Sequence, residues 1–409
     1  MVVLKLLAFA ALAVLVLLAV WRLALPEFRL PPPEGPYGIG TMTYHFVDAT
    51  RHEEFSPDQR VRRELIVQVW YPAMPPRAAT RARYLPDADA LTQAIARRMR
   101  WPWFSLARWS GIASNAVRAI PVADGAHRYP VLVFLEGLGG FRQMDTFLVD
   151  QLVSRGYVVA AIDQPLVAAV VVFPDGRRIT GWSKRTMQPL IQQSLAPAAN
   201  PPRLYGRVLR AGIVPYLAED ARFALERLGD LDRADPDGIL TGRLDLKRAG
   251  VFGVSLGGIV ASEAARIEPR FRACVVLDAP MPAQVISAGL RQPTMWITRD
   301  ATTMRNEGWR ESDIVQHQTT MRSAFDHQRG AGYFVRIAGM YHANFTDIPF
   351  VSPLLPALGV TGPMEASRAH AIVTAYTLAF FGRHLVGRPD ALLTRPASQY
   401  PEVLFESRR

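Results

Sequence analysis

Short apolar runs alternate with helical stretches along most of the chain. The runs are Val131–Leu135, Tyr157–Asp163, Ala249–Phe252, Phe271–Leu277 and Thr294–Thr298. The intervening segments have helical periodicity, most clearly Leu204–Leu228 and the closing Ala366–Leu385. Strands that are apolar throughout are buried on both faces, which is typical of a parallel sheet covered by helices on each side. The pattern therefore predicts an α/β fold with a mostly parallel, doubly wound sheet.

An apolar run near the N-terminus predicts an additional hydrophobic helix. Leu6–Leu25 contains one charge, Arg22, whose long side chain can reach a membrane surface. About 20 helical residues at ~1.5 Å each cover ~30 Å, the thickness of the hydrocarbon core of a membrane. Residues 1–25 are therefore predicted to be a membrane anchor. The alternative is a cleaved signal peptide, which the lack of a small-x-small site just after the run disfavours.

The remaining chain is predicted to form a linker and one domain. Leu30–Pro36 is rich in proline and favours a stiff, extended conformation, so residues 26–40 are assigned to a linker and residues 41–409 to the domain. The expected location is a membrane-anchored domain outside the cytoplasm, or a secreted or periplasmic domain after signal cleavage. Lys5 and Arg22 flank the run almost equally, so charge does not fix its orientation.

Composition and charge narrow the classes of partner. The 409 residues include 47 Lys and Arg against 36 Asp and Glu, a formal net charge of +11. The basic residues are scattered and form no nucleic-acid-binding motif, so an anionic membrane surface is the expected partner rather than nucleic acid.

Cys274 is the only cysteine, which excludes an internal disulfide. The chain has no H-E-x-x-H and no paired cysteines, and no metal or cofactor is predicted. Oligomeric state is not indicated.

One short motif gives the first indication of chemistry. Gly253–Gly257 has the pattern G-x-S-x-G between the predicted strand Ala249–Phe252 and a predicted helix. In this context the serine stands on a strained turn that projects its hydroxyl above the sheet. The helix that follows directs backbone amides toward a developing oxyanion. Ser255 is therefore predicted to be a nucleophile, and the domain to have the α/β-hydrolase fold.

A serine nucleophile needs a general base, and in this architecture the histidine follows the serine in the chain. His342 lies in a loop after the strand-like Gly332–Ile337, where the base is expected. His317 lies in the polar stretch Gln316–Arg329, which is typical of a solvated helix. His342 is therefore the predicted base.

The oxyanion hole and the triad acid complete the expected site. Two backbone amides are needed: one is predicted at Leu256, directly after the nucleophile, and the other in the glycine-rich loop Glu136–Gly140. Two carboxylates compete for the role of acid. Asp278 and Asp300 each follow a predicted strand. The commonest position of the acid in this fold slightly favours Asp300.

These segments resemble the plasma-type platelet-activating-factor acetylhydrolases, within the wider dienelactone-hydrolase-like group of α/β-hydrolases. The resemblance covers about Gln68 to Leu392 and rests on Phe134–Arg142, Gly253–Gly258, Ala273–Ala279 and His342–Asp347. It implies that Asp278 is the acid and that the amides of Leu138 and Leu256 bind the oxyanion. It also implies calcium-independent hydrolysis of short or oxidised sn-2 acyl esters of phospholipids. The family usually has histidine where this chain has Glu136.

A basic, aromatic stretch fits the lipid-contacting region of the same family. Ala94–Ile120 interleaves arginines with Trp101, Trp103 and Trp109. Tryptophan and arginine together suit a membrane interface, so the three tryptophans are predicted to bind lipid. The alternative is an ordinary amphipathic cap over the active site.

Together these features predict a serine carboxylic-ester hydrolase that acts through an acyl-enzyme on short-chain or phospholipid sn-2 acyl esters. One alternative is another hydrolase on the same fold, such as a polyester hydrolase, a lipase or a peptidase. The other is a non-catalytic, membrane-anchored binding module, which the full set of Ser255, Asp278 and His342 argues against.

Overall fold

The computed structural model describes most of the chain. The described residues are 5, 9, 11–16, 28–56, 58, 60–99, 106, 109–125, 127–395 and 397–408. Within this part of the chain, no helix is both long enough and apolar enough to cross a membrane. The predicted anchor Leu6–Leu25 falls mainly on residues outside the described part, and it stays a prediction.

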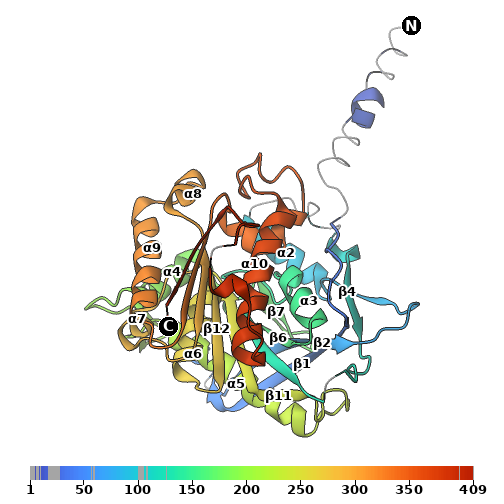
Figure 1. The fold of residues 1–409 in the computed structure, drawn as a ribbon, viewed down its shortest axis with the longest axis horizontal. Coiled ribbons are helices and arrows are strands. Elements are labelled where there is room, and N and C mark those ends of the chain that lie inside the picture. The colour runs from blue at the N-terminus through green and yellow to red at the C-terminus, as the bar shows by residue number, and fades with distance from the viewer. Residues whose placement is uncertain are drawn as a thin grey trace.

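A single large sheet organises the protein (Figure 1). Its 11 strands lie in the order β15-β14-β13-β12-β11-β5-β6-β2-β1-β4-β3. The strands are β1 (Gly38–His52), β2 (Arg62–Ala73), β3 (Arg81–Arg83), β4 (Ala113–Arg118), β5 (Tyr129–Leu135), β6 (Val158–Asp163), β11 (Leu244–Val254), β12 (Phe271–Leu277), β13 (Thr294–Thr298), β14 (Gly332–Ile337) and β15 (Val403–Arg408). Neighbours from β6 through β5, β11, β12 and β13 to β14 run parallel, while β2 and β15 join antiparallel at the two ends of this block. The mostly parallel sheet is therefore confirmed.

Helices cover both faces of the sheet. They are α2 (Ala88–Met99), α3 (Thr146–Ser154), α4 (Lys184–Leu195), α5 (Val214–Arg233), α6 (Leu256–Ile267), α7 (Ala283–Ala288), α8 (Ala301–Asn306), α9 (Glu311–Asp326) and α10 (Ala366–Phe381). Short helical turns follow at η2 (His342–Phe345), η3 (Ile348–Phe350), η4 (Gly382–Val386) and η5 (Ala391–Leu393). Figure 1 shows α3 and α10 side by side over one face of the sheet.

The pleat of the central strands explains the two cores. In β5, Val131 and Val133 pack into one core with α5 and α6, while Leu132 and Phe134 pack into the other with α3 and α10. Successive side chains of a strand point to opposite faces, so a strand buried on both sides must be apolar at every position. This is the physical basis of the uninterrupted apolar runs in the sequence.

One predicted element differs from the structure. The long helix expected over Leu204–Leu228 begins only at Val214, because the preceding residues form a small hairpin of β9 (Arg203–Leu204) and β10 (Arg207–Val208). Gly206 and Gly212 have positive φ angles of 78° and 71°, which no helix accommodates. A second small hairpin joins β7 (Val170–Val172) to β8 (Arg178–Thr180) beside the main sheet.

The predicted linker lies against the domain. Leu30 is buried, and the amide of Gly35 donates a hydrogen bond of 3.2 Å to Oγ of Ser154 at the end of α3. The carbonyl of Pro31 accepts a bond of 2.8 Å from Nδ2 of Asn115 in β4. These contacts fix residues 30–35 along the domain surface, and β1 already begins at Gly38.

Candidate active site

Ser255 stands on the sharp turn between β11 and α6. Its φ of 57° and ψ of −124° place a non-glycine residue in a strained conformation. A Cβ on Gly257 would collide with the carbonyl oxygen of Leu135, and one on Gly253 would collide with the backbone of Gly257. Only glycine fits at both positions, because the turn presses against the neighbouring strand β5. The tight packing of this turn therefore explains why the motif has glycine at these two positions.

The glycine-rich loop after β5 lies directly against Ser255. A Cβ on Gly137 would lie 3.2 Å from Cβ of Ser255. The amide of Gly139 already donates to the carbonyl of Val167 at 2.8 Å, and that of Gly140 donates to the carbonyl of Gly137 at 2.9 Å. No acceptor among the described residues takes the amide of Leu138. This amide is therefore available to a ligand beside Ser255.

Glu136 stands where the family that the sequence resembles usually has histidine, and it lies in the protein interior. Its side chain is fully buried and accepts a hydrogen bond of 3.1 Å from the amide of Gln164. Burial, and then the nearby Asp163 carboxylate, raise the pKa of Glu136 well above its usual value. The protonated, neutral form of Glu136 is therefore favoured at the start of the glycine-rich loop.

His342 begins the helical turn η2, in the loop after β14, and its ring contacts Asp278. Nδ1 of His342 lies 2.6 Å from Oδ2 of Asp278. Asn344 holds this loop, since its Oδ1 accepts hydrogen bonds from the amides of Tyr341 at 2.8 Å and Gly362 at 2.7 Å. A proton on Nδ1 that is donated to Asp278 leaves Nε2 free as an acceptor, which is the state a general base requires.

Asp278 is a buried carboxylate surrounded by donors and cations. Thr298 donates a hydrogen bond of 2.9 Å to Oδ1, and Nε of Arg299 donates one of 2.9 Å to Oδ2. His317 lies 3.5 Å from Oδ1. Burial alone would raise the pKa of Asp278, but Arg299, the hydrogen bond from His342 and the nearby His317 hold it well below its usual range. Asp278 therefore stays ionised.

The side chain of Asp300 caps a helix. It is the N-cap of α8, where it accepts hydrogen bonds of 2.8 Å from the amide and 3.1 Å from the hydroxyl of Thr303. Such capping satisfies an otherwise unpaired donor of the helix. The geometry brings Asp278, and not Asp300, to His342, against the slight preference that the general architecture gave.

A buried ionic network behind Asp278 was not predicted from the sequence. Arg299 is fully buried, pairs with both Asp278 and Glu307, and its guanidinium carbon lies 4.5 Å from the centre of the Trp309 ring. Glu307 also accepts a hydrogen bond of 3.2 Å from the amide of His342. The network thus links the side chain of Asp278 to the backbone of His342.

His317 was wrongly expected on a solvated helix. It is 1% exposed, because α9 turns one face to the protein interior. Burial lowers the pKa of His317 to about 4, so the ring is neutral beside Asp278. The helical spacing of Ile314, His317 and Met321 was the signal that could have identified the buried face.

A cavity of about 1370 Å³ opens above Ser255 and His342. Apolar side chains form much of its wall, among them Phe28, Met144 and Leu355. Trp109 is half-buried in this wall and stacks on Phe28 at 6.3 Å between ring centres. Trp101 and Trp103 lie outside the described residues, so lipid binding by the three tryptophans stays a prediction.

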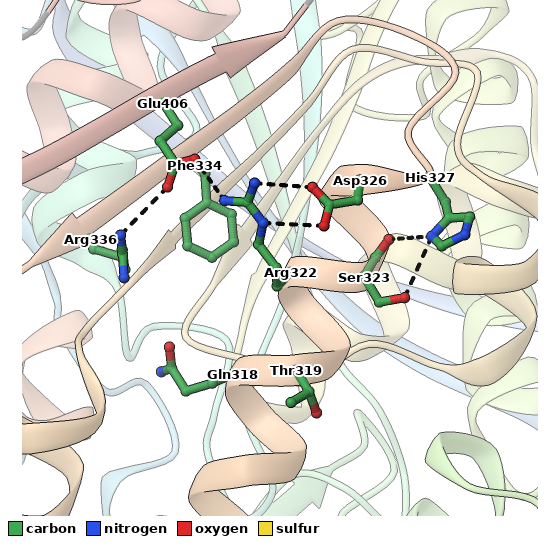
Figure 2. A pocket seen from close by; sticks show the side chains of 9 residues that line it. All are labelled: Gln318, Thr319, Arg322, Ser323, Asp326, His327, Phe334, Arg336 and Glu406. Atoms are coloured by element: carbon green, nitrogen blue, oxygen red, sulfur yellow. Dashed lines mark hydrogen bonds and ion pairs between the residues drawn. The ribbon is translucent and has the colours of Figure 1, made fainter.

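A second hollow, of about 490 Å³, lies between α9 and the strands β14 and β15 (Figure 2). Its charged side chains neutralise one another: Arg322 contacts Asp326 and Glu406, and Arg336 contacts Glu406.

In the described part of the chain, no group of three or more His, Cys, Asp or Glu residues could hold a metal ion.

The fold is that of an α/β-hydrolase, with Ser255 and His342 at one cavity and the buried Asp278 in contact with His342. The family described as platelet-activating factor acetylhydrolase, isoform II, matches residues 24–173 and 237–391, and the chain belongs to this family. The resemblance seen in the sequence is thereby confirmed.

Individual relatives agree with this assignment. The chain is 24% identical over 287 residues to platelet-activating factor acetylhydrolase of Gallus gallus, covering 64% of each protein. It is 25% identical to the Bos taurus protein of that name and spans 60% of its length. It is 23% identical to a probable 1-alkyl-2-acetylglycerophosphocholine esterase of Arthroderma benhamiae, over 93% of this chain and 94% of that protein. The chain thus spans less than two thirds of these vertebrate relatives.

A solved structure is similar over nearly the whole chain. The ferulic acid esterase from Streptomyces cinnamoneus superposes with a TM-score of 0.71 and 30% sequence identity, covering 93% of this chain and 99% of that protein. Its fold supports the α/β-hydrolase assignment.

Proposed function

We propose that the protein is a serine carboxylic-ester hydrolase that works through an acyl-enzyme. One observation carries the proposal: Ser255, on its strained turn, lines the same cavity as His342, whose Nδ1 is bound to the buried Asp278. This is the arrangement of a serine nucleophile, a base and an orienting acid.

Each group then has a defined role. Nε2 of His342 takes the proton of the Ser255 hydroxyl as the oxygen attacks the ester carbonyl, and later returns it to the leaving alcohol. Asp278 fixes the tautomer and stabilises the imidazolium. The amides of Leu138 and Leu256 donate hydrogen bonds to the oxyanion. Water then releases the acid by the reverse sequence.

The proposed substrates are short-chain acyl esters, including sn-2 acetyl esters of phospholipids. The wide, largely apolar cavity can hold an alkyl chain while the ester carbonyl lies at Ser255. The names of the Gallus gallus and Arthroderma benhamiae relatives support the acetyl-ester class.

Attachment to a membrane surface through Leu6–Leu25 belongs to the same proposal, and a need for detergent during extraction tests it.

A substrate panel tests the proposed activity. We expect 4-nitrophenyl acetate and butyrate, and a 1-alkyl-2-acetylglycerophosphocholine, to be hydrolysed faster than the long-chain 4-nitrophenyl dodecanoate, a feruloyl ester or a peptide anilide. A larger kcat/KM for the peptide would favour the peptidase alternative. No turnover together with no fluorophosphonate labelling would identify a non-catalytic binding module.

Arg299 gives a prediction about pH dependence. Its positive charge helps to hold the pKa of Asp278 well below the usual range of a carboxyl group. In Arg299→Met, burial should therefore raise the pKa of Asp278, and the loss of kcat/KM on the acid side should begin at a higher pH. Loss of one partner of a buried ion pair should also lower the unfolding free energy by about 3–5 kcal/mol.

Arg305→Met is the matched control for this prediction, because Arg305 is an exposed arginine of α8 paired with Glu311. The measurement is kcat/KM from pH 4 to pH 9 with melting curves for each variant. An acid limb that stays in place in a folded Arg299→Met protein would contradict the electrostatic role.

A further inference from the structure

Arg98, at the end of α2, lies directly over the oxyanion loop. A Cβ on Gly139 would come within 2.5 Å of Nε and 2.6 Å of Cζ of Arg98, so the guanidinium rests on the bare backbone of this glycine. Gly139 follows Leu138, whose amide has no acceptor among the described residues. The cation is therefore one residue away from the proposed oxyanion hole.

The charge of Arg98 is not neutralised within the described part of the protein. Nη1 donates a hydrogen bond of 3.0 Å to the carbonyl of Trp182, and no carboxylate among the described residues forms an ion pair with Arg98. Arg97, Arg178 and Lys184 line the same cavity, and they too have no carboxylate partner among those residues. Arg98 is an exposed residue, and partial burial of its guanidinium against the loop lowers its pKa.

The carboxylates that line this cavity are all engaged elsewhere. Asp313 pairs with Arg310, and Glu307 pairs with Arg299. Asp347 is buried and accepts hydrogen bonds from the hydroxyl of Tyr84 and from the start of α3. The hollow in Figure 2 shows the opposite arrangement, in which each arginine meets a carboxylate. Among the described residues that line the cavity, the cations without a carboxylate partner therefore leave an excess of positive charge, and Arg98 places part of it at Gly139.

We propose that Arg98 is a specificity-determining residue that binds an anionic group of the substrate, a phosphodiester or a carboxylate, close to the ester held at Ser255. A guanidinium presents several donors in one plane and suits both kinds of oxyanion. Its position over Gly139 sets the anion a short distance from the scissile ester. The proposal rests on the esterase function proposed above.

Paired substrates test this inference. One pair is 1-alkyl-2-acetylglycerophosphocholine and the phosphate-free 1-alkyl-2-acetylglycerol; the other is the 4-nitrophenyl monoester of succinic acid and 4-nitrophenyl butyrate. The wild-type protein should prefer the charged member of at least one pair, and which pair responds distinguishes a phosphodiester from a carboxylate. Arg98→Gln should lower kcat/KM for that charged ester by about tenfold, mainly through KM, and should change the neutral ester much less.

Two further variants make the test specific. Arg98→Lys keeps the charge and should recover part of the preference, while Arg185→Gln removes an exposed charge of α4 outside the cavity and should leave the preference intact. Raising the salt concentration should weaken the preference in the wild type but not in Arg98→Gln.

Three results would overturn the inference. One is a wild-type protein that hydrolyses both members of each pair equally. Another is an equal loss on charged and neutral esters in Arg98→Gln, which would make Arg98 a structural link to Trp182. The third is the same loss of preference in Arg185→Gln. Failure of the proposed function is separate, because it would remove hydrolysis of the neutral esters as well.

Discussion

Replacing Ser255 with alanine is expected to lower kcat for a soluble ester by at least about 10⁴-fold and to abolish fluorophosphonate labelling. The hydroxyl supplies the oxygen that becomes acylated, and neither His342 nor the oxyanion amides can replace it. The backbone of the turn is held by the hydrogen bond of 2.9 Å from the Ser255 amide to the carbonyl of Leu277, which alanine keeps. The variant should therefore fold like the wild type.

Ser287→Ala is the matched control, since Ser287 is an exposed serine of α7 that lies outside the cavity. Labelling and kcat should be those of the wild type in this variant. Retained labelling in a folded Ser255→Ala protein would show that another residue is the nucleophile and would remove the basis of the mechanism.

The strands of the sheet were predictable because the signal for each strand lies in its own residues. The predicted runs Phe271–Leu277 and Thr294–Thr298 coincide with β12 and β13. Burial on both faces demands apolar residues at every position, so the run itself marks the strand. The helix expected over Leu204–Leu228 failed for the complementary reason, because apolar periodicity continues through a segment whose glycines turn the chain. Side-chain pattern does not report the backbone angles of a turn.

In the site, too, the residues marked by a local pattern could be predicted, and those that depend on long-range contacts could not. Ser255 and His342 were identifiable from a turn motif and from a loop after a strand, both of which are local features. Arg299 was not, because arginine next to a strand end is ordinarily exposed and only the folded chain brings Asp278 and Glu307 to it. Its burial depends on two carboxylates that neutralise it, so the signal lies in three separate segments.

The choice between Asp278 and Asp300 gives the second large effect. Asp278→Asn should lower kcat by about 10³–10⁴-fold, because an amide cannot hold His342 in the reactive tautomer or stabilise its positive charge. Asp300→Asn should cost about tenfold or less, which corresponds to ~1.4 kcal/mol. Asparagine is also a good N-cap, so it can keep the bond to Thr303 at the start of α8.

The two variants control for each other, since each converts a carboxylate at the end of a neighbouring strand into its amide. Asp278→Asn also leaves Arg299 with Glu307 as its remaining acidic partner, so melting curves must accompany the kinetics on one soluble ester. The bond of 2.6 Å between His342 and Asp278 makes the expected order of activity clear. If a folded Asp300→Asn protein were crippled while Asp278→Asn remained active, the carboxylate that orients His342 during turnover would be Asp300, and the contact with Asp278 would have no part in catalysis.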